Sequence, residues 1–178
     1  MSDTPNLRVV ITGAPGSGKT TLIRTLSEMG YQTFSEVSRN LIEQGMVAPI
    51  QQPEPNPGQF LGMVVSLRID QHWAWNGSKM TFYDRGLPDS LAFIKYMKKE
   101  VPDWLSDIIR EHPYHNKVVF LPPWKKIFRH DNVRKEPFEE TLLLHQLLLD
   151  AYSSLGYQIL ELPECPVKKR AELLLGLL

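Results

Sequence analysis

The chain has 178 residues, which is enough to bury the core of one α/β domain and too few for two domains of ordinary size. Its 20 basic and 20 acidic residues balance, so it lacks the positive excess typical of a general nucleic-acid-binding protein. We therefore expect a single domain over residues 1–178 and no nucleic-acid partner.

The sequence indicates neither secretion nor membrane insertion. Met1–Pro5 lacks the basic start and apolar run of a signal peptide. No stretch approaches the ~20 apolar residues that a membrane-spanning helix needs. The single cysteine, Cys165, cannot form an internal disulfide, which suits a reducing compartment. We expect a cytoplasmic protein without membrane contact, in which Cys165 is an ordinary buried or half-buried thiol.

The first predicted strand leads into a glycine-rich loop and then a helix. Leu7–Thr12 is a short apolar, β-branched run suited to a buried parallel strand. Residues 13–20 read Gly-Ala-Pro-Gly-Ser-Gly-Lys-Thr, which matches the phosphate-loop pattern G-x-x-x-x-G-K-[ST]. Thr21–Leu26 has helical apolar spacing, and Gly30 can end that helix. A glycine-rich turn that matches by chance is the alternative, and the flanking strand and helix argue against it.

These residue types suit a nucleoside triphosphate. The three glycines allow backbone N–H groups to wrap around a phosphate at the positive end of a helix. Lys19 would reach the β- and γ-phosphates while packing little, and the Thr20 hydroxyl would ligate Mg²⁺. We therefore predict an ATP and Mg²⁺ site whose nucleotide contacts are Gly13, Ala14, Pro15, Gly16, Ser17, Gly18, Lys19, Thr20 and Thr21.

The next predicted strand, Tyr31–Ser35, ends at a charged pair. Glu36 begins a helix predicted to reach about Gln44, and Arg39 lies on the same helical face. A carboxylate at a strand end opposite the phosphates can accept a proton from an attacking hydroxyl. Glu36 is thus a candidate base, and Arg39 a candidate acceptor contact. The alternative is an exposed first-turn glutamate favoured by the helix dipole.

A proline-rich loop, residues 45–58, precedes a long predicted helix, Phe60–Trp75. The loop and the helix would form one wall of an acceptor site. Arg68, Gln71 and Trp73 are available on that helix, although such residues more often serve packing or the surface.

The third predicted strand, Met80–Asp84, leads directly into Arg85 and Gly86. Ligands of an open parallel sheet bind beyond the carboxyl ends of its strands. An aspartate at this point holds Mg²⁺ or its water shell in phosphate-loop proteins. Asp84 is therefore a candidate metal ligand beside Thr20. A turn aspartate or a helix N-cap is the alternative interpretation.

The remaining elements continue the alternation of strands and helices. Helices are predicted over residues 87–97 and 104–111, a strand over 117–121, a helix over 138–155, a strand over 157–162 and a helix over 167–175. This alternation predicts an α/β fold, with helices on both faces of a parallel sheet. The helix over 138–155 carries an apolar stripe of Leu144, Leu147, Leu148, Ala151 and Leu155.

A basic segment, residues 124–136, separates the fourth predicted strand from the long leucine-rich helix. Such a segment can close over a triphosphate as a lid, and its arginines can then neutralise charge on the transferred phosphoryl group. We expect Arg134 to take part in catalysis and Arg129 to contact the nucleotide. A solvated basic loop is the alternative.

Three motifs together resemble the small AAA_28-type P-loop proteins. They are the phosphate loop, Glu36-Val37-Ser38-Arg39 and Phe82-Tyr83-Asp84-Arg85-Gly86. The group is similar to the ribosylnicotinamide kinase domain of NadR and, more distantly, to deoxynucleoside kinases. The resemblance covers nearly the whole chain. It implies a three-layer P-loop nucleoside-kinase-like fold, whose five parallel strands follow the order 2-3-1-4-5.

The resemblance also implies roles for individual residues. In deoxynucleoside kinases a glutamate after the second strand is the base, and an acidic residue followed by arginine after the third strand supports Mg²⁺ and phosphate. Glu36 and Asp84-Arg85 match those positions. The chain is too short for the helical lid domain of AAA+ machines, and it lacks the Asn-Lys-x-Asp guanine reader of Ras-like GTPases.

We therefore expect an ATP- and Mg²⁺-dependent phosphotransferase that acts on a hydroxyl of a small metabolite, with a nucleoside among the candidate acceptors. The expected catalytic residues are Lys19, Glu36, Asp84, Arg85 and Arg134, and the expected acceptor contacts are Arg39, Arg68 and Gln71. The alternative is a P-loop ATPase that acts as a nucleotide-dependent switch. A large exposed apolar patch instead of a closed cleft would favour the switch.

Overall fold

The computed structural model describes residues 6–43, 57–77, 79–128 and 137–178. Its centre is a five-stranded sheet with the order β2-β3-β1-β4-β5, in which every pairing is parallel. The strands are β1 (Arg8–Thr12), β2 (Gln32–Phe34), β3 (Thr81–Asp84), β4 (Lys117–Phe120) and β5 (Gln158–Glu161). The predicted α/β fold and its strand order are confirmed.

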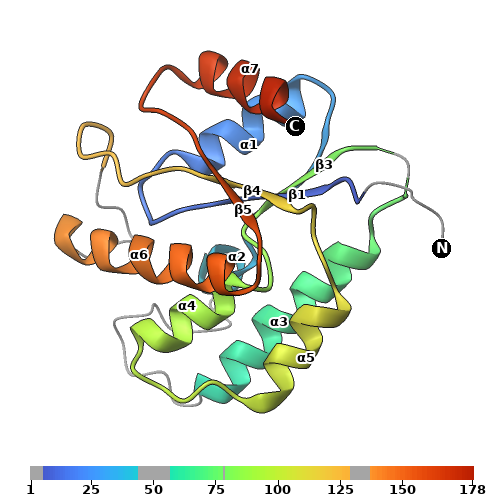
Figure 1. The fold of residues 1–178 in the computed structure, drawn as a ribbon, viewed down its shortest axis with the longest axis vertical. Helices are drawn as coiled ribbons and strands as arrows, with labels where there is room; N and C mark the ends of the chain where they lie inside the picture. Colours follow the sequence, from blue (N-terminus) through green and yellow to red (C-terminus); the bar gives the residue numbers. More distant parts are fainter. Residues whose placement is uncertain (1–5, 44–56, 78, 129–136) are drawn as a thin grey trace.

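Helices cover both faces of the sheet (Figure 1). One face carries α1 (Lys19–Glu28) and α7 (Val167–Leu177). The other carries α2 (Val37–Glu43), α3 (Pro57–Trp73), α4 (Asp89–Tyr96), α5 (Asp103–Glu111) and α6 (Phe138–Ser154). None of the helices in the described ranges is long and apolar enough to cross a membrane.

The predicted loop over residues 45–58 is wrong at its end, because α3 already begins at Pro57. Proline suits the first position of a helix, since its fixed φ is helical and its missing N–H would have no intrahelical partner there. The rest of that loop, residues 45–56, lies outside the described residues.

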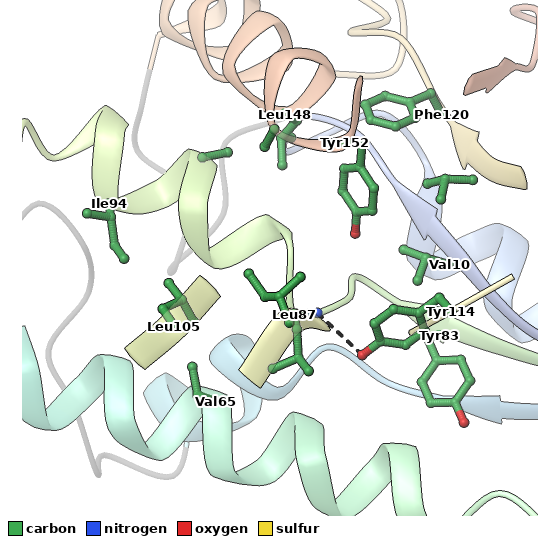
Figure 2. Close-up of a cluster of buried hydrophobic side chains, with 14 of the residues drawn as sticks. Val10, Val65, Tyr83, Leu87, Ile94, Leu105, Tyr114, Phe120, Leu148 and Tyr152 are labelled. Carbon is green, nitrogen blue, oxygen red and sulfur yellow. Dashed lines mark hydrogen bonds between the residues drawn. The ribbon is translucent and has the colours of Figure 1, made fainter. Parts of the chain in front are cut away.

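Alternating side chains of the central strands enter two separate apolar layers. Val9 and Ile11 pack with residues of α1 and α7, whereas Val10 packs with residues of α3 to α6 (Figure 2). All three are fully buried. Because a strand between two helical layers is covered on both sides, it reads as a continuous apolar run rather than an alternating one.

The apolar stripe predicted on α6 is correct except at its end. Leu144, Leu148 and Ala151 are buried and Leu147 packs partly against the same cluster. The prediction for Leu155 is wrong, since 40% of this residue is exposed. The helix ends at Ser154, so Leu155 no longer follows the helical stripe.

Gly86 lies where the turn after β3 meets the core most closely. A Cβ atom there would come 2.9 Å from Val10 Cγ2, 3.0 Å from Tyr152 Oη and 3.1 Å from Tyr114 Cε2. All three neighbours are buried, so none can move aside easily. This position therefore has no room for a larger residue.

Gly86→Ala should destabilise the protein by about 1–3 kcal/mol through overpacking. The matched control is Gly62→Ala in α3, where a Cβ would meet nothing within 4 Å. That change should instead stabilise the protein by up to about 1 kcal/mol, because alanine is the better helix former. Urea unfolding measures both, and equal effects would show that the turn is not tightly packed.

Candidate functional site

The glycine-rich loop has the backbone conformation that an anion-binding loop requires. Gly13, Gly16 and Gly18 have φ values of 137°, 80° and 92°. A Cβ at Gly13 would come 2.2 Å from the Leu121 carbonyl oxygen, so only glycine fits. Gly18 caps α1, whose first residue is Lys19. The loop thus leads into a helix N-terminus, where backbone N–H groups favour phosphate.

Lys19 lies inside this loop. Its ammonium donates to the carbonyl oxygens of Gly13 and Ala14, each at 2.9 Å. The residue is only 6% exposed, so the expectation that it packs little is wrong. The loop itself forms its surroundings, because the backbone curls around the side chain. This places the ammonium where a bound phosphate would meet it.

Thr20, in the first turn of α1, meets Asp84 at the carboxyl end of β3. The Thr20 hydroxyl donates to Asp84 Oδ2 at 3.4 Å. Asp84 is 3% exposed, and its Oδ1 atom has no hydrogen-bond partner among the described residues. Burial, together with the nearby Glu36 carboxylate, raises the pKa of Asp84 to about 6. A buried carboxylate oxygen without a donor favours a cation or its water shell.

Thr20 and Asp84 therefore fit Mg²⁺ but would supply only part of its coordination. Within the described ranges, no three His, Cys, Asp or Glu side chains gather into a metal site. Magnesium in nucleotide sites keeps several waters and binds through one or two carboxylates plus phosphates. The remaining ligands would thus come from the nucleotide and from water.

Arg85 joins two carboxylates immediately after β3. Its Nε donates to Glu36 Oε1 at 2.8 Å, and its Nη1 donates to Asp89 Oδ1 at 3.0 Å. The side chain is 2% exposed, and the backbone has a φ of 72°, which is strained for a residue other than glycine. Such strain persists only where the surroundings determine the conformation.

The charge of Glu36 depends on this ion pair. Burial alone would raise the pKa of Glu36, but the Arg85 guanidinium and the Lys19 ammonium outweigh it and lower that pKa. The carboxylate is therefore ionised at neutral pH. Its side chain is 19% exposed, so the alternative of a simple exposed first-turn glutamate does not describe it. Glu36 also precedes α2 rather than lying inside it.

One cavity of about 580 Å³ connects the glycine-rich loop with the Glu36–Arg85 pair, and Asp84 does not line it. It includes Lys19 and Thr20 of the loop and both members of the Glu36–Arg85 pair. Its apolar wall on one side comes from α3 and α4: Phe60, Leu61, Val64, Phe93 and Ile94, with Met97 after α4. Its wall on the other side comes from the chain after β4 and the start of α7: Trp124, Ile127, Cys165, Pro166, Val167 and Arg170.

The predicted acceptor contacts divide into two groups. Arg39 and Arg68 line the cavity, and the buried Arg68 donates from Nη1 to Ser90 Oγ at 2.8 Å. Gln71 instead donates to the Ser35 carbonyl at 3.0 Å, and Trp73 is 71% exposed at the end of α3. Neither of these two lines the cavity.

The predicted phosphate contacts Arg129 and Arg134 lie outside the described residues, so their roles stay predictions. The part of the basic segment that is described does reach the glycine-rich loop. A Cβ at Gly16 would come 2.6 Å from Phe128 Cδ2, and one at Gly18 would come 3.3 Å from Ile127 Cδ1. The start of this segment thus packs directly on the loop.

Sequence reasoning missed two buried charged residues of the site, Asp89 and Arg170. Arg170 in α7 is 2% exposed, donates from Nη1 to the Ser17 carbonyl at 2.9 Å, and lies 4.8 Å from the centre of the Trp124 ring. No local pattern points to the contact of Arg170 with the loop, because Ser17 and Trp124 are far from it in the chain. Asp89 follows Arg85 by four residues, but Arg85 precedes α4 and has a left-handed backbone, so no helical spacing points to this pair.

Comparison with known proteins places the chain in a family. The family model AAA_28, described as an AAA domain, matches residues 8–170. The chain belongs to this family. No curated protein matches the sequence.

Solved structures of P-loop kinases share the fold. Deoxyadenosine kinase from M. mycoides with bound dATP has a TM-score of 0.71 and 18% identity, over 95% of this chain and 97% of that one. Thymidylate kinase from Candida albicans has a TM-score of 0.67 and 13% identity, over 99% and 92%. Thymidylate kinase from Ehrlichia chaffeensis has a TM-score of 0.67 and 10% identity, over 97% and 98%. At these identities, the likeness shows the fold alone.

The raised pKa of Asp84 predicts a cost to stability in the empty protein. An unfolded aspartate titrates near pH 4, whereas folded Asp84 keeps its proton to about pH 6. Stability therefore falls as the pH rises from about 4 to about 6, and it stays reduced above that range. Asp84→Asn cannot ionise and escapes this cost.

In metal-free buffer without nucleotide, Asp84→Asn should be more stable than wild type by about 1–3 kcal/mol near pH 8. The advantage should shrink below about pH 4, where both states of the wild-type carboxyl are protonated. Thermal unfolding at the two pH values measures this. Asp70→Asn on the exposed face of α3 is the control. A lower stability of Asp84→Asn at both pH values would contradict the proposed cost.

Proposed function

We propose that this protein transfers the γ-phosphoryl group of ATP to a hydroxyl of a small, nucleoside-like acceptor, with Mg²⁺ on the triphosphate. The observation that carries the proposal is that the glycine-rich loop and the Glu36–Arg85 ion pair line one cavity. The loop supplies a phosphate site, and the ion pair supplies a carboxylate with a cation beside it. Both requirements of phosphoryl transfer are thus within one space.

The donor side consists of the loop, Lys19, Thr20 and Asp84. Backbone N–H groups of the loop would hold the phosphates, and Lys19 would neutralise charge on the transferred group. Thr20 and Asp84 would hold Mg²⁺, which when bound neutralises charge on the phosphates. Because phosphoryl transfer has a loose transition state, these fixed charges do most of the catalytic work.

The acceptor side consists of Glu36 and Arg85. An ionised Glu36 would accept a hydrogen bond from the acceptor hydroxyl and then its proton. Arg85 would keep Glu36 ionised and meet the phosphoryl group as it arrives. Both side chains are held by the same ion pair, so the attacking oxygen and the phosphoryl group would be oriented together.

The rest of the acceptor side favours a flat compound with a polar edge. Phe60 and Phe93 supply aromatic walls, and the buried Arg68 supplies hydrogen-bond donors. A nucleoside has this combination of a ring and polar edges. The kinases with the same fold act, by their names, on a nucleoside or a nucleotide. A pure switch would need no such cavity.

We further propose that residues 124–136 act as a lid of this single domain, with Arg129 and Arg134 meeting the phosphates. The contacts of Ile127 and Phe128 with the glycine-rich loop support this role. Arg39 and Arg68 would contact the acceptor. Gln71 was expected to share that task, but its hydrogen bond to Ser35 gives it a structural one.

A panel of nucleosides and related metabolites with labelled ATP tests the function. Lys19→Met keeps the buried stem and removes the ammonium, so transfer should fall by a factor of about 100 or more. Lys95→Met on the exposed face of α4 is the matched control and should retain full activity. The proposal fails if Lys19→Met, folded by circular dichroism, transfers phosphate at the wild-type rate.

Glu36→Gln separates a kinase from a switch. This change keeps the size of the side chain and removes its ability to accept a proton, so transfer should fall roughly 10²–10⁴-fold. ATP affinity should hardly change, because the phosphates bind at the loop. Acceptor phosphorylation and stabilisation by Mg²⁺–ATP are measured on the same sample. Undiminished transfer would remove Glu36 from the mechanism, and ATP hydrolysis without any acceptor would favour the switch.

A further inference from the structure

Asp89 is a buried carboxylate that accepts four hydrogen bonds. Oδ1 accepts from the Thr12 hydroxyl at 2.6 Å and from Arg85 Nη1 at 3.0 Å. Oδ2 accepts from the Gly86 N–H at 2.9 Å and from the Tyr152 hydroxyl at 2.6 Å. The residue has no exposed surface. Its donors come from the end of β1, the turn after β3 and α6, so one side chain joins three segments.

The charge of Asp89 is retained despite this burial. Burial would raise the pKa of Asp89, but the guanidinium groups of Arg85 and Arg68 and the two hydroxyl donors lower it. An ionised acceptor makes stronger hydrogen bonds than a neutral one, and an arginine that pairs with carboxylates has a fixed plane. The ion pair with Asp89 therefore fixes the orientation of the Arg85 guanidinium.

Arg85 needs such an anchor. Its backbone is in the left-handed region, with a φ of 72°. Its guanidinium donates from Nε to Glu36 and from Nη1 to Asp89, and Arg85 lines the cavity. Asp89 itself does not line the cavity. It can therefore act on a reaction only through Arg85 or through the start of the loop.

The second connection of Asp89 is to that loop. Thr12 is the last residue of β1 and immediately precedes Gly13. The same Oδ1 atom thus accepts from Thr12, which fixes the entry to the phosphate loop, and from Arg85, which holds Glu36. This shared atom therefore links the donor and acceptor parts of the site.

We propose that Asp89 is a positioning residue, which aims Arg85 at Glu36 and at the phosphoryl group and sets the acceptor side relative to the phosphate loop. This inference rests on the proposed phosphotransfer for its kinetic consequences. Its structural consequence, the position of Arg85 against Glu36, can be measured without turnover.

Asp89→Asn keeps the size and removes the charge. Misplacement of a reacting group by about 1 Å can cost ~100-fold, so kcat should fall by about that factor, while the KM for ATP changes by less than about threefold. Loss of the Asp89 charge would by itself lower the pKa of Glu36, and Lys19 and Arg68 still act to lower it. Arg85 is the cation that lowers this pKa most, so its displacement acts in the opposite direction. The positioning role therefore predicts a net rise in the pKa of Glu36. The acid limb of the kcat/KM profile should then move to higher pH.

Tyr152→Phe is the matched control. It removes another hydrogen bond to the same carboxylate, from α6, and leaves Arg85 and Thr12 in place. It should lower the melting temperature without moving the acid limb or kcat. An acid limb that stays in place or moves to lower pH in Asp89→Asn would overturn the positioning role, and so would an equal loss of kcat in both variants.

A titration of the Glu36 carboxyl by ¹³C NMR separates this inference from the proposed function. Glu36→Gln assigns the resonance, and the pKa of Glu36 should be higher in Asp89→Asn than in wild type. If Asp89→Asn does not fold, Asp89→Ser removes the same charge without added volume and should give the same shift. An unchanged pKa overturns the positioning role, whereas a wild type that phosphorylates no acceptor overturns only the phosphotransfer.

Discussion

The Arg85 guanidinium between Glu36 and Asp89 is the contact on which the arrangement of the site depends. Removing one partner of such a buried pair typically costs about 3–5 kcal/mol, because the other charge stays buried without compensation. The left-handed backbone of Arg85 adds strain of about 1–3 kcal/mol. Both costs arise at the carboxyl edge of the sheet. A strained but fixed Arg85 guanidinium would be of use there in phosphoryl transfer.

The charges gathered around Arg85 give the neighbouring carboxylates different pKa values. Glu36 and Asp89 are paired with Arg85, and their pKa values are lowered. Asp84 lies beside them and forms no ion pair within the described part of the chain, and its pKa is raised to about 6. Asp84 is also the carboxylate beside the Thr20 hydroxyl. A bound cation would remove the cost of ionising Asp84, so loading the site should also stabilise the fold.

Much of this could be predicted from sequence, because the motifs are local and the ends of parallel strands share one edge of the sheet. The phosphate loop, Glu36 and Asp84 were found in this way, as was the strand order through the family resemblance. Arg85 was also predicted as a catalytic residue, but its ion pair with Glu36 was not, since that pair depends on β2 lying beside β3 with Phe34 opposite Tyr83. Arg170 reaches the phosphate loop only through the packing of α7, and Tyr152 reaches Asp89 only through the packing of α6. Leu155 was wrongly assigned to the apolar stripe of α6, because the apolar repeat does not show at which residue a helix ends.

Two buried charges hold the phosphate loop from opposite faces of the sheet. On the face covered by α4 and α6, Asp89 binds Thr12 directly before the loop. On the face covered by α7, Arg170 binds the Ser17 carbonyl within it. Each charge also contacts a second part of the site: Asp89 binds Arg85, and Arg170 stacks on Trp124. A loop held in this way keeps its N–H groups in place before a nucleotide arrives, which is the condition for electrostatic stabilisation without reorganisation. If the site closes around substrates, the segments that flank the cavity therefore move, and the phosphate loop stays in place.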